Sequence, residues 1–430
     1  MSNIYIEGYG CSASQCEAEI MAGLIEQAGF KVIKNEEYAD LIIIVTCFVK
    51  SPTENKILFR IKQLKESYSN KKLIIAGCMP EGIYRKIVDL VPEASLVSTH
   101  HIKEIPQAVK KTLEGKRVEY LKKSEEIKLC LPKIRKNPVV DIVPISSGCD
   151  SACSYCCVRF VKGKLFSYPE EMIIKEVENS LKQGCKEIWL TAQDTASYGL
   201  DENKARLPEL LNKIGEIPGK FFVRVGMMNP KNALPILNNL IKSYQNEKIY
   251  KFLHLPVQSG DNEVLERMNR GYKTEDFLKI VKEFKKNINF QLWTDVIVGF
   301  PEETEEQFEN TVKLIKDIKP DWTNVSKFGL RPRTPAKSLK QLPSREISER
   351  SERLSRIVRE ISLEKNKEWI GWEGVVLVSK RGRKLNQWLG RNLAYKPILV
   401  ESKENLIGKF VRIKIKEFDY SFLKGILIQD

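Results

Sequence analysis

Short apolar runs alternate with longer amphipathic stretches throughout residues 1–113. Three of these runs have the length and apolar content of buried strands: 3–7, 41–45 and 72–76. Between them, apolar residues recur at helical spacing, as in 17–28. Strands that alternate with helices form parallel sheets, so this pattern predicts a parallel α/β domain at the amino terminus.

The same alternation continues along the chain for six more strand–helix units. Their predicted strands lie near 139–145, 187–191, 220–226, 249–255, 291–299 and 322–328. Six such units predict a partial (β/α)6 barrel over residues 139–342, with functional loops after the carboxyl ends of the strands. The stretch 114–138 is rich in Lys, Arg and Glu, which predicts a linker or a solvated edge.

A charged amphipathic helix is predicted at 343–367, before a final module at 368–430. Short alternating runs between Gly and charged turns predict a small β-barrel there, so the fold class is α/β with a small carboxyl-terminal β-barrel. Basic residues outnumber acidic ones in this module, and its aromatic residues offer either base stacking or core packing. We expect Arg381, Arg383 and Lys384 to contact nucleic-acid phosphates, with a merely solvated face as the alternative.

Three cysteines with CxxxCxxC spacing follow the first barrel strand: Cys149, Cys153 and Cys156. Thiolates suit iron–sulfur clusters, and a [4Fe–4S] cubane held by three cysteines leaves one iron open for chemistry. The alternative is structural zinc, but closed zinc sites have four ligands, usually in paired CxxC elements. Cys157 is adjacent to Cys156 and badly placed to complete a tetrahedron. The spacing therefore favours an open cluster.

Three more cysteines follow the predicted amino-terminal strands: Cys11, Cys47 and Cys78. The carboxyl ends of parallel strands meet at one edge of a sheet, where open α/β folds bind ligands. A single buried cysteine is commonly a packing residue, as we expect for Cys16. Three cysteines at equivalent positions instead favour a second iron–sulfur cluster.

The amino-acid composition indicates the cellular compartment and the kind of binding partner. Ten cysteines without secretory features indicate a reducing compartment, and we expect a cytoplasmic protein. The chain leads at once into an apolar strand, so we expect no signal peptide, and no apolar run is long enough to span a membrane. The net charge of +15 favours a polyanionic partner such as nucleic acid, although lysine-rich proteomes also produce basic enzymes.

The CxxxCxxC motif, with Tyr155 before its last cysteine, resembles the radical S-adenosylmethionine (SAM) enzymes. In that family the open iron binds SAM, and reductive cleavage yields a 5′-deoxyadenosyl radical. The resemblance implies a barrel-mouth site for SAM and substrate. Polar residues at the expected strand ends are its candidates, each with an ordinary loop role as the alternative: Tyr155, Gln193, Asp194, Arg224, Gln258 and Ser259.

Nearly the whole chain resembles one radical SAM subfamily, the methylthiotransferases. The stretches that carry the resemblance include GYGCSASQCEAEIM, LTAQDTASYG, VGMMNP, LHLPVQSG, VLERMNRGY and LGRNLAYKP. These enzymes have a three-cysteine amino-terminal domain, a radical SAM barrel and a TRAM barrel, in that order. The resemblance implies two [4Fe–4S] clusters, the SAM cluster on Cys149, Cys153 and Cys156 and an auxiliary cluster on Cys11, Cys47 and Cys78.

Several of these stretches look most like the archaeal and eukaryotic branch, which acts on N6-threonylcarbamoyladenosine beside the tRNA anticodon, at position 37. The implied reaction adds a methylthio group to carbon 2 of the adenine and uses SAM twice. The implied partners are tRNA, bound through its anticodon loop, and an electron donor such as a flavodoxin or ferredoxin; we expect a monomer. Two positions depart from the family, because Glu302 and Arg333 replace its usual glycines, which puts the conformation of their loops in doubt.

Other functions stay open at this point. The alternative enzymes act on another tRNA adenosine or on an aspartate of a ribosomal protein. The basic final module argues against the ribosomal protein, since a barrel that docks on a basic protein should be acidic. A nucleic-acid-binding protein with structural metal is the non-enzymatic alternative, and the two sets of three cysteines argue against it.

Overall fold

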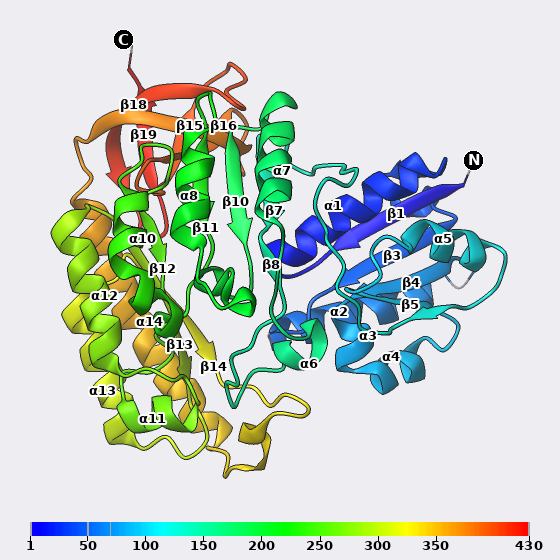
Figure 1. Ribbon diagram of the computed structural model, residues 1–430, viewed down its shortest axis with the longest axis horizontal. Coiled ribbons are helices and arrows are strands. Elements are labelled where there is room, and N and C mark those ends of the chain that lie inside the picture. Colours follow the sequence, from blue (N-terminus) through cyan, green and yellow to red (C-terminus); the bar gives the residue numbers. More distant parts are fainter. Residues whose placement is uncertain (1, 50, 69, 429–430) are drawn as a thin grey trace.

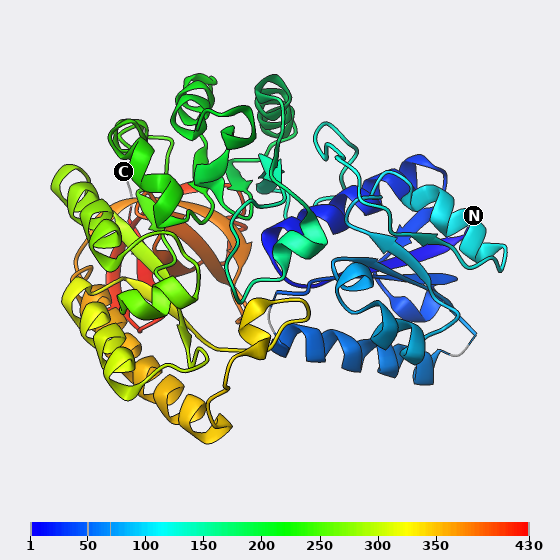
Figure 2. The same ribbon diagram turned by 60° about the horizontal axis from the view of Figure 1, so that its bottom comes forward.

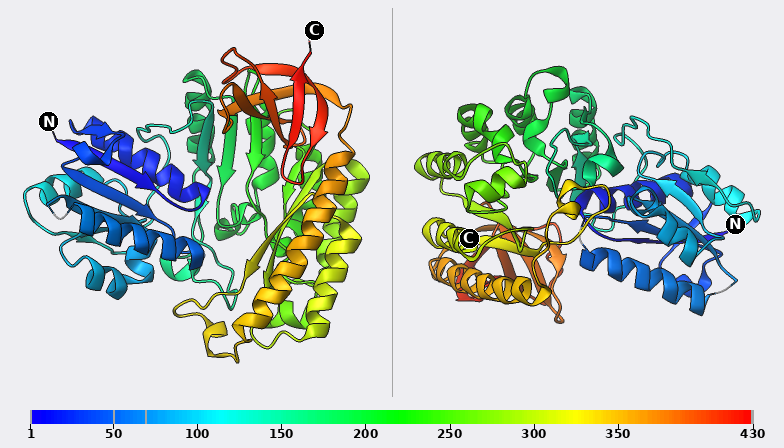
Figure 3. Two further views of the ribbon diagram at one scale, coloured as in Figure 1. Left: turned by 180° about the vertical axis from the view of Figure 1, so that it is seen from behind. Right: turned by 90° about the horizontal axis from the view of Figure 1, so that it is seen from below.

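The computed structural model describes residues 2–49, 51–68 and 70–428. The chain forms an amino-terminal domain, a central partial barrel and a small carboxyl-terminal barrel (Figure 1). The amino-terminal domain lies beside the central domain, whereas the small barrel covers one end of it, as the view from behind also shows (Figure 3). Among the described residues, no helix combines the length and the apolar content needed to cross a membrane.

The amino-terminal domain is a six-stranded parallel sheet in the order β2-β1-β3-β4-β5-β6. Every residue of the central strand β3, LIIIVT, is buried, as expected for a strand covered on both faces. Helices α1 and α5 pack on one face, and α2, α3 and α4 pack on the other. The elements are β1 (Asn3–Gly8), α1 (Ser12–Gln27), β2 (Lys31–Ile33), β3 (Leu41–Thr46), α2 (Ser51–Ser67), β4 (Lys72–Gly77), α3 (Met79–Gly82), α4 (Tyr84–Leu90), β5 (Ser95–Ser98), α5 (Ile105–Leu113) and β6 (Glu119–Tyr120).

The predicted parallel α/β domain is therefore confirmed, and the three predicted strands correspond to β1, β3 and β4. The sequence analysis did not find β2, β5 and β6. Strands β2 and β6 are the short edges of the sheet, and β5 (SLVS) has polar residues at both ends, so none of the three forms an apolar run.

The stretch 114–138 packs more closely than its charged composition predicts. Its Lys128 and Leu129 are 5% and 2% exposed, so the expectation of a solvated stretch is wrong at these residues. The backbone N–H of Ile134 donates to the carbonyl of Glu19 in α1 at 3.0 Å, which ties the stretch to the amino-terminal domain. Lys128 can be buried because Glu17 lies 2.7 Å away as a partner of opposite charge.

The central domain confirms the predicted partial barrel of six parallel strands. Strands β7, β10 and β11 form one half, β12, β13 and β14 form the other, and a parallel bridge between Val223 and Ile249 links them. Figure 2 looks toward the carboxyl ends of these strands, with the helices around the outside. The elements are β7 (Val140–Pro144), β8 (Ser146–Ser147), α6 (Val158–Lys162), β9 (Phe166–Ser167), α7 (Glu170–Lys182), β10 (Glu187–Thr191), α8 (Leu207–Glu216), β11 (Phe222–Val225), α9 (Pro230–Ala233), α10 (Leu237–Tyr244), β12 (Phe252–His254), α11 (Asn262–Arg267), α12 (Thr274–Asn287), β13 (Gln291–Val298), α13 (Glu305–Ile318), β14 (Trp322–Lys327) and α14 (Ser344–Lys367).

The carboxyl-terminal module is a closed five-stranded barrel in the order β15-β16-β17-β19-β18, as predicted. It docks at the amino ends of the central strands. Lys186, just before β10, donates to the carbonyl of Gly408 at 2.7 Å, and the N–H of Lys251, just before β12, donates to the carbonyl of Leu393 at 2.8 Å. We call this end of the central barrel the floor and the opposite, carboxyl end the mouth. The strands are β15 (Glu373–Arg381), β16 (Gln387–Asn392), β17 (Pro397–Glu401), β18 (Phe410–Phe418) and β19 (Leu423–Leu427).

Candidate active site at the barrel mouth

The cysteine loop of the central domain follows β7 and β8 and ends in α6, so it lies at the mouth. Gly148 opens the loop with a φ of +75°, and a Cβ there would lie 1.7 Å from the carbonyl oxygen of Lys164. Only glycine tolerates this approach. The backbone N–H of Cys149 donates to the carbonyl of Gly163 at 3.2 Å, so the loop closes on itself around its three cysteines.

A second mouth segment, residues 267–270, holds the cysteine loop in place. Ser154 donates through its backbone N–H to the carbonyl of Met268 at 3.0 Å and through its hydroxyl to the carbonyl of Arg267 at 2.7 Å. The amide of Asn269 donates to the carbonyl of Ala152 at 2.8 Å. These bonds fix the backbone between the first and third cysteines.

Arg270 is the mouth residue that the sequence analysis missed. The residue is 7% exposed. Its guanidinium donates to the sulfur of Cys153 and to the hydroxyl of Tyr155, both at 3.3 Å, and to the amide oxygen of Asn229 at 3.4 Å. This buried positive charge therefore lies directly against one of the three cysteines of the loop. The only signal in the sequence was its place in the VLERMNRGY stretch.

The chemistry of this loop fits an open cluster. Burial raises the pKa of the Cys149 thiol and raises that of Cys156 to about 12, so metal binding must release their protons. A fourth thiol does not join them, since Cys157 donates to the carbonyl of Phe48 at 3.5 Å, within the amino-terminal core. In the described part of the chain, no three His, Cys, Asp or Glu side chains are placed to bind one metal ion. A cubane instead spreads its ligands over different irons.

The amino-terminal cysteines lie at the carboxyl ends of three adjacent strands, β1, β3 and β4. Gly10 has a φ of +100°, and a Cβ there would lie 2.1 Å from the Cβ of Cys47, so glycine brings the Cys11 loop against Cys47. The N–H of Cys78 donates to the carbonyl of Thr46 at 3.1 Å, which joins the next two strand ends. The backbone therefore brings Cys11, Cys47 and Cys78 to one edge of the sheet, as expected.

The three amino-terminal sulfurs also influence one another. A hydrogen bond from Cys47, assisted by the charge of Lys162, lowers the pKa of Cys11 to about 5. The same bond raises the pKa of Cys47, and burial raises that of Cys78 to about 12. Cys16, by contrast, is 1% exposed and donates to the carbonyl of Ile142 at 3.2 Å, so its predicted packing role is confirmed.

Two of the predicted cofactor-binding residues follow β10. The carboxylate of Asp194 accepts from the N–H of Ala196 at 3.1 Å, the N–H of Asn229 at 2.9 Å and the amide of Asn232 at 2.7 Å. It therefore ties the loops after β10 and β11 together. Gln193 differs, because its buried Oε1 has no hydrogen-bond partner within the described residues. Gln193 is thus better placed than Asp194 to receive a ligand group.

The two candidates after β12, Gln258 and Ser259, also differ in whether their side chains are available to a ligand. Ser259 is fully buried, and its hydroxyl lies 3.3 Å from that of Thr311 and accepts from the N–H of Asp261 at 3.2 Å. Gln258 has a φ of +71°, and its backbone N–H donates to the carbonyl of Asp295 at 2.8 Å. The residue is half-exposed at the mouth. Ser259 therefore shapes the loop, and Gln258 is the candidate for ligand contact.

Arg224 does not join the group around Cys153. Its guanidinium lies over the rings of Trp189, Phe252 and Tyr395, at 5.2, 5.5 and 5.7 Å, so it faces the floor. A role for Arg224 in SAM binding stays a prediction. The barrel interior also contains a pair that the sequence analysis missed, His254 and Asp295, whose Nε2 and Oδ2 atoms are 2.6 Å apart.

Comparisons with known proteins agree with this geometry. Residues 143–315 match the model of the Radical SAM superfamily, residues 3–99 match Uncharacterized protein family UPF0004, and residues 370–428 match the TRAM domain. A solved radical S-adenosylmethionine methyltransferase, TsrM from Kitasatospora setae, has a similar fold, with a TM-score of 0.59 at 14% identity over 78% of this chain and 75% of its own. The mouth and its cysteine loop thus define a radical SAM enzyme, which implies SAM and a [4Fe–4S] cluster as cofactors.

Full-length relatives narrow the class. A Pyrococcus abyssi protein named "Probable threonylcarbamoyladenosine tRNA methylthiotransferase" is 43% identical over 99% of both chains. A Methanothermobacter thermautotrophicus protein of the same name is 40% identical over 98% of both chains, and the Homo sapiens threonylcarbamoyladenosine tRNA methylthiotransferase is 35% identical over 100% of this chain and 75% of its own. The chain belongs to the threonylcarbamoyladenosine tRNA methylthiotransferase family.

Proposed function

We propose that this enzyme converts N6-threonylcarbamoyladenosine at position 37 of tRNA, beside the anticodon, to its 2-methylthio derivative. The observation that carries the proposal is the second set of three cysteines, gathered at one sheet edge next to the core domain. A radical SAM enzyme needs only the first set to cleave SAM. A second set fits a reaction that must also deliver sulfur.

We assign the second [4Fe–4S] cluster to Cys11, Cys47 and Cys78. Thiol chemistry and convergence at the ends of β1, β3 and β4 support this ligand set. When bound, the two clusters and SAM supply the radical and the methylthio group. The chain itself supplies the orientation: Arg270 and the segment before it hold the first cysteine loop, and α6 connects that loop to the amino-terminal domain.

The tRNA must reach both ends of the central barrel. β13 has eight residues, which at the usual rise per residue and strand tilt places the mouth about 20 Å from the floor. The small barrel on the floor therefore cannot touch a base in the mouth. We infer that it holds phosphates of the stem, while the target base leaves its stack to enter the mouth.

The candidate phosphate contacts lie on the hairpin that joins β15 to β16. Arg381, Arg383 and Lys384 are all exposed there, which supports their assignment. Base stacking by Trp388 and Tyr395 has little support, because they are 5% and 4% exposed, whereas Tyr420 is 37% exposed. Their aromatic area is part of the core and of the floor, so we assign the module to backbone binding.

The decisive experiment is mass spectrometry of tRNA nucleosides from cells with and without this protein. Loss of 2-methylthio-N6-threonylcarbamoyladenosine, with accumulation of its unmodified precursor, supports the proposal. Loss of a methylthio group from another adenosine or from a ribosomal protein supports the alternative enzymes. Unchanged nucleosides and proteins would support a binding protein with structural metal. A flavodoxin or ferredoxin as reductant, a monomeric state and a cytoplasmic location stay predictions.

A further inference from the structure

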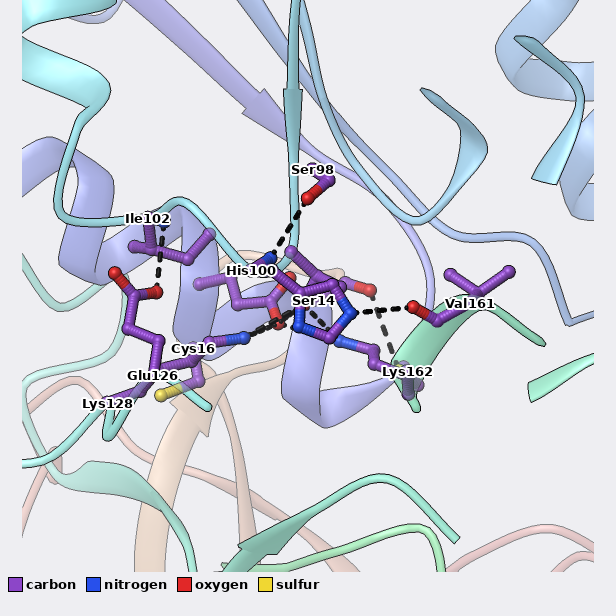
Figure 4. Close-up of polar contacts among 12 residues, drawn as sticks. Ser14, Cys16, Ser98, His100, Ile102, Glu126, Lys128, Val161 and Lys162 are labelled. Atoms are coloured by element: carbon purple, nitrogen blue, oxygen red, sulfur yellow. Dashed lines mark hydrogen bonds and ion pairs between the residues drawn. The ribbon is translucent and has the colours of Figure 1, made fainter. Parts of the chain in front are cut away.

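A buried charge network lies where three parts of the chain meet. Glu17 comes from α1, Lys128 from the stretch 114–138, and Lys162 from the end of α6. Both ammonium groups donate to the same oxygen of Glu17 at 2.7 Å, and both donate to the hydroxyl of Thr99, at 2.8 Å from Lys128 and 2.6 Å from Lys162. Figure 4 shows the two lysines approaching from opposite sides.

This network contains more positive than negative charge. Two ammonium groups face one carboxylate, and the side chains of Lys128, Lys162 and Glu17 are only 7%, 6% and 3% exposed. The nearby Glu126 accepts from the backbone N–H groups of residues 102 and 103, and its negative charge attracts Lys128. Lys162 therefore shares its hydrogen-bonded carboxylate, Glu17, with a second ammonium group, and a buried cation in this position is costly unless a further negative charge lies near it.

The network lies at the strand ends that carry the amino-terminal cysteines. The N–H of Thr99, whose hydroxyl accepts from Lys162 at 2.6 Å, donates to the carbonyl of Gly77, the residue before Cys78, at 3.2 Å. Glu17 lies on α1, which begins directly after Cys11. Three thiolates around a [4Fe–4S]2+ core give a net charge of −1, which is opposite to the charge of Lys162. Lys162 also ends the helix that begins two residues after Cys156, so one short segment serves both sets of cysteines.

We propose that Lys162 is a positioning residue for a cluster on Cys11, Cys47 and Cys78, that it supplies the balancing positive charge and that it sets the equilibrium of the cluster's one-electron reduction. This inference rests on the second cluster of the proposed function. Reduction by a low-potential titrant adds one electron and changes the net charge from −1 to −2, without making or breaking a bond. A nearby cation favours the more negative form.

The test starts from a parent variant in which Cys149, Cys153 and Cys156 are replaced by alanine, so that every cluster signal comes from the amino-terminal set. The parent is compared with Lys162→Met, Lys162→Arg and Lys128→Met added to it. After anaerobic reconstitution, iron is counted and the reduction is followed by electron paramagnetic resonance in a redox titration. We expect Lys162→Met to disfavour reduction by about tenfold or more, which is 59 mV for one electron.

The conservative Lys162→Arg should stay within about threefold of the parent, and Lys128→Met, which removes an equal charge from the same network, should shift the equilibrium less than Lys162→Met. A loaded Lys162→Met variant with an unshifted equilibrium, or a shift no larger than that of Lys128→Met, would overturn the inference and leave the second cluster intact. A parent without iron would overturn both the inference and the second cluster.

Loading itself gives a second measurement. If Lys162→Met binds no iron while Lys162→Arg binds as much as the parent, the positive charge is required and the inference is supported. If neither variant binds iron although both unfold at the temperature of the parent, the fit of the lysine side chain matters rather than its charge, and the inference is wrong.

Discussion

The mouth and the floor of the central barrel differ in the kinds of side chain that they contain. At the mouth, polar loops surround thiols and a buried guanidinium, and Arg270 contacts Cys153 at 3.3 Å. At the floor, rings pack on rings, and Tyr395 lies 4.5 Å from Phe252 and 4.8 Å from Tyr250 between ring centroids. Burial of apolar area stabilises the floor, whereas the mouth buries polar and charged groups, which costs folding free energy unless a ligand binds them.

The backbone shows the same contrast. The loops of the mouth place non-glycine residues at positive φ: Gln258, Asn269, Glu302 and Arg333, at +71°, +53°, +64° and +62°. Such residues are held in place only where the surrounding structure fixes them, and they gather at functional sites. At the floor, Lys319 has this conformation at +45° where it ends α13, and Tyr395 has it at +66° with its ring buried in the aromatic cluster. Changes at the mouth should therefore alter chemistry, and changes on the small barrel should alter binding.

The largest expected effect comes from the mouth cysteines. Replacing Cys149, Cys153 and Cys156 by alanine should abolish reductive SAM cleavage, because no other three-thiol site lies in the central domain. The chain should also lose about half of about eight bound irons, one of two cubanes. Iron analysis and detection of 5′-deoxyadenosine measure both effects. Undiminished SAM cleavage by this variant would falsify the assignment of the loop.

The amino-terminal cysteines should separate two parts of the reaction. A variant with alanine at Cys11, Cys47 and Cys78 should still cleave SAM, since the loop held by Arg270 is intact. It should form no methylthio nucleoside. Cys16→Ala is the matched control, because this buried thiol packs near the same edge, and it should retain the product. Normal turnover by the triple variant would make these cysteines merely structural.

An intermediate effect is expected on the hairpin of the small barrel. Charge reversal of Arg381, Arg383 and Lys384 to glutamate should weaken tRNA binding by at least about tenfold, because three phosphate contacts and their counterion release are lost. The slope of log affinity against log salt should fall by about 0.7–0.9 for each contact. SAM cleavage without tRNA should not change, since the hairpin is remote from the mouth.

Equal charge reversal elsewhere provides the control for that experiment. Lys279, Lys282 and Lys286 are exposed on the outer face of α12, and their replacement by glutamate changes the net charge by the same amount. We expect a smaller loss of affinity from this variant. If both variants bind tRNA equally well at every salt concentration, the hairpin is only a solvated face.

Spacing in the sequence predicted the first cysteine set, and the alternation of strands and helices predicted that the second set meets at one sheet edge, since parallel strands end at the same edge. It could not find Arg270 or Lys162, because a basic residue shows no sign of its partner until the fold brings thiols to it. It also misplaced Lys128, whose charge looks solvated until Glu17 is seen beside it, 111 residues away in the chain.

The smallest expected effect tests the strain of the mouth. Glu302 stands where the resemblance implies glycine, is exposed, and has the left-handed φ of +64° that glycine adopts freely. Glu302→Gly should remove about 1–2 kcal/mol of backbone strain. Glycine also adds about 0.5–1 kcal/mol of unfolded-state entropy, so we expect the free energy of unfolding to rise by at most about 1.5 kcal/mol. The matched change Glu306→Gly, in the first turn of α13, should lower it by about 0.5–1 kcal/mol. Chemical denaturation of the apoprotein compares the two variants. Equal destabilisation by both would mean that the loop, and not the residue, sets this conformation, and that the mouth stores no strain at Glu302.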